Sequence, residues 1–170
     1  HKLRQHPPRF GHVSMAVSRW VPELAEAGLR LLGDLGYHGV SQVEFKRDTR
    51  DGTYRLMEVN ARHWMWHSLA TACGVNLSLA AYRDAIGEPY MSARQVDGPK
   101  WVVSFTDARD ALGRWRRGKE RLWPWLASYR GVRVDGLYSL RDPLPGALMT
   151  ARQLKNIIRR SGKPAEGETV

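Results

Sequence analysis

Two glutamates and an asparagine stand out as candidate metal ligands, on two segments that have the pattern of a β-hairpin. Asp51-Gly52 lies between the predicted strands 38–48 and 54–62, and an Asp-Gly pair is a strong hairpin signal. If the loop is centred on Asp51, Glu44 lies opposite Glu58. Like charges in that position repel each other. A divalent cation that prefers hard oxygen ligands, such as Mg²⁺, would offset the repulsion.

Further polar side chains share this face of the predicted hairpin, because side chains alternate along a strand. Asn60 offers another oxygen beside Glu58, and Arg62 could hold an anion through its bidentate fork. Lys46, expected opposite Leu56, either contacts phosphate or remains a solvated strand lysine. The alternative is that the whole face is merely solvated, since a register change of one residue would separate the glutamates. The other face is expected to pack on the core, with Val43, Phe45, Met57, Val59 and Ala61.

The stretch Val43-Glu44-Phe45-Lys46, with Leu56-Met57-Glu58-Val59-Asn60-Ala61-Arg62-His63-Trp64, resembles the magnesium-binding end of ATP-grasp ligases. In that superfamily an acidic residue on one strand and Glu-x-Asn on the next hold metal ions on the ATP phosphates. The resemblance implies that Glu44, Glu58 and Asn60 bind Mg²⁺ and ATP, with Mn²⁺ as an alternative metal. It implies catalytic roles at phosphate or substrate for Arg62 and Lys46. Ala61 stands where many family members have proline.

The resemblance also implies a reaction, in which a carboxylate–amine ligase forms an amide or peptide bond. ATP phosphorylates a carboxylate to an acyl phosphate, and an amine then displaces the phosphate, while metal ions neutralise the charge in transfer. The implied partners are ATP and small carboxylate and amine substrates. The residues that hold adenine and phosphate in the family's earlier lobe are not found in these 170 residues. We therefore expect the C-terminal half of a larger enzyme, partnered by the missing N-terminal lobe, and the sequence leaves a homo-oligomer open.

The helices and strands expected around these residues indicate an α+β fold. We expect an antiparallel sheet flanked by helices, as in an ATP-grasp C-terminal lobe. Apolar residues at helical spacing predict a helix over 21–35, and a strand is expected over 10–19. Further expectations are helices over 68–73 and 77–86, a strand over 100–106, helical pieces over 108–127 and a helix over 147–160. A boundary near Gly98-Pro99 would divide the catalytic lobe, 1–98, from a basic, Trp-rich extension, 99–170.

Composition sets the remaining limits. The formal net charge is +10, and residues 109–133 carry eight basic and two acidic side chains with three tryptophans among them. This segment supports an alternative function, a binding module for nucleic acid or an anionic membrane surface. One cysteine, Cys73, excludes a disulfide scaffold. The absence of a long apolar run and of a signal-peptide pattern favours a cytoplasmic location.

Overall fold

The computed structural model describes residues 1–7 and 11–161, with side chains to residue 156 at the C-terminal end. The mixture of helices and mainly antiparallel strands confirms the predicted α+β class. None of the helices in this described part is long and apolar enough to cross a membrane. In chain order the elements are β1 (Lys2–His6), β2 (His12–Val17), α1 (Pro22–Asp34), β3 (Gln42–Arg47), β4 (Tyr54–Asn60), α2 (Ser68–Ala72), α3 (Leu77–Ala85), β5 (Lys100–Val102), α4 (Ser104–Arg116), α5 (Leu122–Ala127), β6 (Val132–Asp135) and α6 (Leu144–Ser161).

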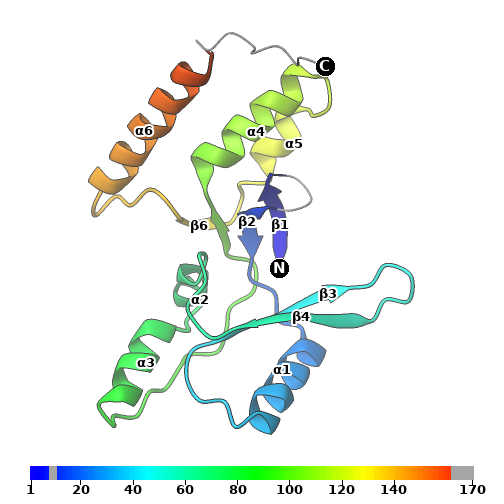
Figure 1. Ribbon diagram of the computed structural model, residues 1–170, viewed down its shortest axis with the longest axis vertical. Helices are drawn as coiled ribbons and strands as arrows, with labels where there is room; N and C mark the ends of the chain where they lie inside the picture. The colour runs from blue at the N-terminus through cyan, green and yellow to red at the C-terminus, as the bar shows by residue number, and fades with distance from the viewer. Residues whose placement is uncertain (8–10, 162–170) are drawn as a thin grey trace, which may run out of the picture.

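The strands form two separate sheets (Figure 1). A four-stranded sheet has the order β1-β2-β5-β6, in which only β5 and β6 run parallel. The hairpin β3–β4 forms a second, two-stranded antiparallel sheet. The pairing of β2 with β5 joins segments on either side of the boundary predicted near residue 98, and the division into domains stays a prediction.

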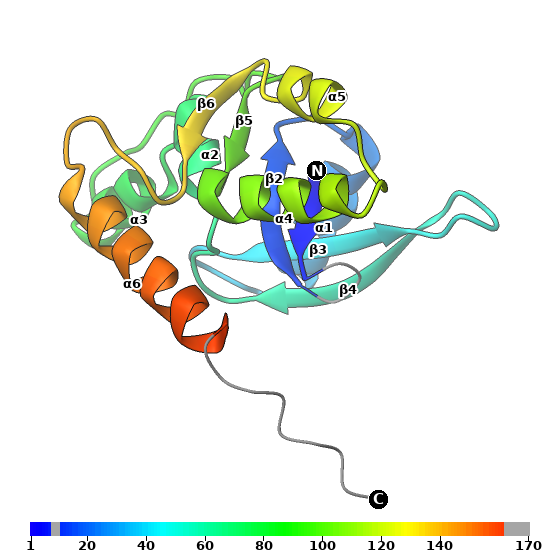
Figure 2. The same ribbon diagram turned by 90° about the horizontal axis from the view of Figure 1, so that it is seen from above.

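The core lies on the two faces of the four-stranded sheet. Helix α2 contacts β5 and β6, while α4 contacts β1 and β2 and lies across the sheet in Figure 2. Because β2 is covered on both faces, all four residues from Val13 to Ala16 are buried instead of alternating. One cluster of buried residues includes Val13, Ala16, Leu69, Cys73 and Trp101. Cys73 is thus a buried core residue with a free thiol.

Several boundaries differ from those predicted. Strand β5 ends at Val102 instead of continuing to residue 106, because Ser104 begins α4, and its N–H donates to the Asp135 carboxylate at 3.2 Å. Helix α4 passes through Gly113 without a break. Pro124 lies inside the first turn of α5, where a missing N–H costs no helical hydrogen bond. Strands β1 and β6 were not expected, and α6 begins at Leu144 instead of residue 147.

The hairpin follows the predicted register near its open end and departs from it near the loop. Glu44 lies opposite Glu58, as predicted, and Gln42 lies opposite Asn60. A bulge between Glu44 and Phe45 then shifts the pairing by one residue. As a result Lys46 lies opposite Arg55, not Leu56, and that predicted pair is wrong.

Candidate metal and nucleotide site

Helix α1 decides which face of the hairpin remains open. A Cβ added at the buried Gly28 would stand 3.9 Å from Phe45 Cε2 and from Val43 Cβ, so α1 packs closely on that side. Val43 and Phe45 are half-buried there, but Met57 is 58% exposed and Val59 is also exposed. The prediction that this face forms core thus holds for Val43 and Phe45 and is wrong for Met57, Val59 and Ala61, which are exposed. The bulge leaves Met57 unpaired. Figure 1 shows α1 on one side of the hairpin only.

Glu44 and Glu58 meet across the open face, and each carboxylate has a partner that reduces the repulsion. The Lys2 ammonium of β1 forms an ion pair with Glu44. The Asn60 side-chain amide donates to Glu58 Oε1 at 2.8 Å. A cation therefore already neutralises one of the two opposed carboxylates. Sequence reasoning missed Lys2, because the segment Lys2–His6 has no apolar alternation to mark it as a strand.

Arg62 lies next to the ligand candidates at the end of β4. Its guanidinium donates to Asn60 Oδ1 at 3.2 Å and to the His63 carbonyl at 3.1 Å, and the side chain is exposed. Hydrogen bonds therefore link Arg62, Asn60 and Glu58, and Glu44 lies opposite Glu58 on the neighbouring strand. Lys46 is exposed and lies on the same side of β3 as Glu44, one alternation closer to the loop.

The donor set of this face suits a hard divalent cation. Two carboxylates and a side-chain amide supply oxygen ligands, which Mg²⁺ prefers, and the remaining positions would be open to water and phosphate. Within residues 1–7 and 11–161 no group of three or more His, Cys, Asp and Glu side chains has an arrangement that could hold a metal. The candidate centre is thus two carboxylates completed by Asn60, and would depend on a substrate for further ligands.

The other acidic groups of the hairpin are engaged within the loop. Hydrogen bonds from Arg50 lower the pKa of Asp48, and hydrogen bonds from Thr53 lower the pKa of Asp51. Arg55 also donates to Asp51 at 2.8 Å. These carboxylates hold the turn around Gly52, whose φ of 75° favours glycine. They are therefore separate from the candidate ligands.

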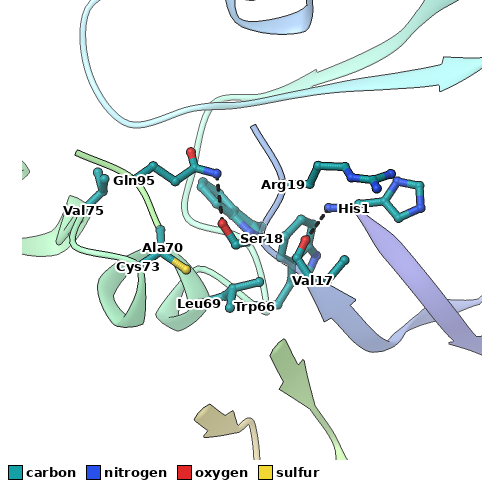
Figure 3. A pocket seen from close by; sticks show the side chains of 11 residues that line it. His1, Val17, Ser18, Arg19, Trp66, Leu69, Ala70, Cys73, Val75 and Gln95 are labelled. Carbon is teal, nitrogen blue, oxygen red and sulfur yellow. Dashed lines mark hydrogen bonds between the residues drawn. The ribbon is translucent and has the colours of Figure 1, made fainter. Parts of the chain in front are cut away.

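A pocket of about 240 Å³ has Trp64, two residues after Arg62 in the sequence, among its lining residues (Figure 3). Trp64 and Trp66 line it. The indole N–H of Trp64 is buried and has no hydrogen-bond partner in the part of the chain that the structure describes. At the rim, the Gln95 amide donates to Ser18 Oγ at 2.9 Å. The remaining lining residues are mainly apolar and come from the first residue, from the end of β2 and the segment after it, and from α2 and the turn after it: His1, Val17, Arg19, Leu69, Ala70, Cys73 and Val75.

Comparison with known proteins gives one positive finding. No curated protein and no solved structure matches the chain. Residues 17–92 match the family described as carbamoyl-phosphate synthase L chain, ATP binding domain. This segment contains α1, the whole β3–β4 hairpin, α2 and α3, and so includes all five residues singled out on the open face. This match supports membership of the ATP-grasp superfamily of ATP-binding domains for residues 17–92.

Proposed function

We propose that this chain is the metal-binding part of an ATP-dependent carboxylate–amine ligase that works through an acyl-phosphate intermediate. The single observation that carries the proposal is the pairing of Glu44 with Glu58, with Asn60 bonded beside them, inside a segment of the ATP-binding family. Two opposed carboxylates are costly unless a cation uses them. Lys2 supplies a cation to Glu44 only, and a nucleotide-bound Mg²⁺ or Mn²⁺ would serve both carboxylates.

In this proposal Glu44, Glu58 and Asn60 would hold the metal, which when bound neutralises phosphate charge during transfer. Arg62 would orient the transferred phosphoryl group, since its guanidinium is exposed and already lies against Asn60. Lys46 would contact phosphate from the same face. Lys2 would leave Glu44 when the metal binds, because both cations use the same carboxylate.

The pocket behind Trp64 and Trp66 supports small substrates for the carboxylate and amine positions. The volume of this pocket, about 240 Å³, is below the range usual for drug-sized ligands. One of its lining residues, Trp64, is two residues after Arg62 in the sequence. The unpartnered Trp64 N–H would donate to a polar atom of such a substrate. We place the enzyme in the cytoplasm, since the one cysteine is a buried free thiol of the kind that a reducing compartment keeps.

Calorimetric titration with Mg-ATP tests the proposal on the protein in its full natural length. Glu58→Gln removes one ligand charge with little change of shape, so we expect the affinity for Mg-ATP to fall at least about tenfold. Glu23→Gln is the matched control, because Glu23 is exposed on α1 and away from the open face. Its affinity should equal that of the wild type.

Equal Mg-ATP affinity in Glu58→Gln and the wild type would overturn the proposed site. Once binding is established, ADP release is measured with pairs of small carboxylates and amines. The ligase assignment requires release that depends on both partners. Release with the carboxylate alone, unaffected by any amine, would contradict the second half of the reaction. For residues 1–170 alone we expect weak binding, because the family's other lobe supplies half of the nucleotide cleft.

A further inference from the structure

The end of the molecule that carries α4, α5 and α6 concentrates positive charge. Residues 104–156 hold eleven basic and five acidic side chains. Three of the acids have internal partners, since Asp107 pairs with Arg4, Asp110 with His6 and Glu120 with Arg114. Nine exposed cations of this segment form no ion pair with any described residue: Arg116, Arg117, Lys119, Arg121, Arg130, Arg133, Arg141, Arg152 and Lys155.

Large apolar side chains are exposed among these cations. Trp123 on α5 is 77% exposed, and Leu126, one turn further along the same helix, is also exposed. On α4, Trp115 is exposed beside Arg116. Aromatic and aliphatic groups interleaved with cations on a protein surface suit a partner that offers both negative charge and an apolar layer.

The least exposed side of α6 is small and polar and meets the segment that leads into the helix. The line that is buried or half-buried runs through Gly146, Thr150 and Gln153, at a spacing of one helical turn. Tyr138 seals this contact, since its hydroxyl is hydrogen-bonded to Thr150 Oγ1 and its ring lies against Gly146.

The opposite side of α6 combines leucines with cations and points to solvent. Leu144, Leu148 and Lys155 follow the helical repeat on that side, with Arg152 along one edge, and Leu148 is 62% exposed. The sequence of α6 contains no acidic residue. This arrangement is typical of helices that lie in the headgroup region of an anionic lipid layer.

We propose that the surface formed by α4, α5 and the outward side of α6 docks on an anionic membrane surface. The cations would meet lipid headgroups, while Trp123, Leu126, Leu144 and Leu148 would enter the headgroup–acyl boundary. Aliphatic side chains favour lipid over nucleic acid, because single-stranded nucleic acid rewards aromatic stacking and phosphate contacts but has no apolar layer for leucine. Figure 1 shows α4, α5 and α6 at one end and the β3–β4 hairpin with α1 toward the other, so docking would leave the candidate metal site free.

Vesicle sedimentation tests this surface with the full protein. Phosphatidylcholine vesicles with about 30% phosphatidylglycerol should pellet the protein, and pure phosphatidylcholine vesicles should not. Leu148→Glu places a charge on the outward side of α6, and we expect at least about tenfold weaker partitioning. Leu29→Glu is the matched control, because Leu29 is 72% exposed on α1 and should leave partitioning unchanged.

A second variant keeps the test independent of α6. Arg116→Gln with Arg117→Gln removes two exposed cations, and each cation near an anionic surface contributes about a fivefold factor to binding. Raising NaCl from about 50 mM to about 500 mM should also weaken binding. Circular dichroism checks that each variant is folded.

The proposal is overturned if anionic vesicles do not bind the wild type, or if Leu148→Glu and Leu29→Glu behave alike. Binding to an oligothymidine with none to vesicles would replace the lipid with nucleic acid. A change from dimer to monomer in Leu148→Glu, without vesicle binding by the wild type, would instead make the outward side of α6 an interface between two copies. Neither result depends on ATP binding, so the ligase proposal is tested independently of this one.

Discussion

At the scale of single residues, the candidate site depends on how two carboxylates can share one face of a hairpin. Glu44 and Glu58 lie opposite each other, and the Lys2 ammonium and the Asn60 amide bond to them. These partners come from β1 and from β4 itself. Each of the two opposed carboxylates thus has a polar partner that reduces the repulsion between them.

Lys2→Met should increase the affinity of this face for divalent cations. The Lys2 ammonium competes for Glu44, and the pair is partly exposed, so its removal should tighten Mn²⁺ binding by about two- to fivefold. Electron paramagnetic resonance of free Mn²⁺ during a titration measures the affinity. Lys119→Met, at the other end of the molecule, serves as the control. Unchanged or weaker binding in Lys2→Met would show that Glu44 does not take part in cation binding.

The sequence could predict the ligand pair but not its neighbours. The Asp-Gly turn and strand alternation were enough to place Glu44 opposite Glu58. The bulge could not be foreseen, because Leu56 and Met57 are both apolar and either could face Phe45. Lys2 was missed because its strand is held by pairing with β2, a long-range contact that leaves no pattern in the segment Lys2–His6.

At the scale of elements, long-range contacts decide where α4 and α6 begin. The Ser104 N–H in the first turn of α4 donates a hydrogen bond to the distant Asp135 carboxylate, a contact that a local pattern does not reveal. The position of α6 against the preceding segment depends on Gly146, which lies against the Tyr138 ring and the Leu137 carbonyl. Strand β6 had a readable signal, the alternating Val132 and Val134, which sequence analysis did not use.

Gly146→Ala should loosen the docking of α6. An added Cβ would stand 2.6 Å from Tyr138 Cδ1 and 2.8 Å from the Leu137 carbonyl oxygen, so the helix must shift, at a cost of about 1–3 kcal/mol. That cost exceeds the gain of up to about 1 kcal/mol in helix propensity. Hydrogen exchange of the α6 amides measures the effect and should become faster.

Gly33→Ala is the matched control for this change. Gly33 lies in α1 with nothing within 4 Å of its added Cβ, so the same substitution should only add helix propensity. We expect stabilisation by about 0.5–1 kcal/mol in urea unfolding. Slower or unchanged exchange in α6 of Gly146→Ala would show that this helix is not held through the Gly146 contact.

At the scale of the whole molecule, one buried carboxylate ties distant parts of the chain together. Asp107 on α4 is 1% exposed and accepts hydrogen bonds from Arg4 on β1, at 2.6 and 2.8 Å. Trp125 Nε1 and the Tyr129 hydroxyl also donate to it, at 2.8 and 2.9 Å. Four donors satisfy the charge, so this cluster joins the edge strand of the sheet to α4, α5 and the turn that follows α5.

Asp107→Asn should destabilise the fold by about 3–5 kcal/mol. The substitution leaves the Arg4 guanidinium partly buried opposite a neutral group, and loss of one partner of such a pair costs that much. Urea unfolding followed by circular dichroism gives the free energy. Asp84→Asn, on an exposed acid of α3, should change it by less than about 1 kcal/mol. A similar small loss in both variants would mean that Asp107 does not organise the molecule.

The same cluster predicts how stability depends on alkaline pH. Burial and the Asp107 charge raise the pKa of Tyr129 above its ordinary value of 10.0. Above pH 10 the unfolded chain therefore loses a phenol proton that the folded chain keeps, so the free energy of unfolding falls as pH rises. Below pH 10 both states hold the proton, and the contribution of the group is constant.

The difference in unfolding free energy between the wild type and Tyr129→Phe isolates this group from the other tyrosines and the lysines. That difference should be flat from pH 7 to about pH 9.5 and then decrease with a slope of up to one proton. A difference that stays constant to about pH 11.5 would show that the hydroxyl titrates alike in the folded and unfolded chains.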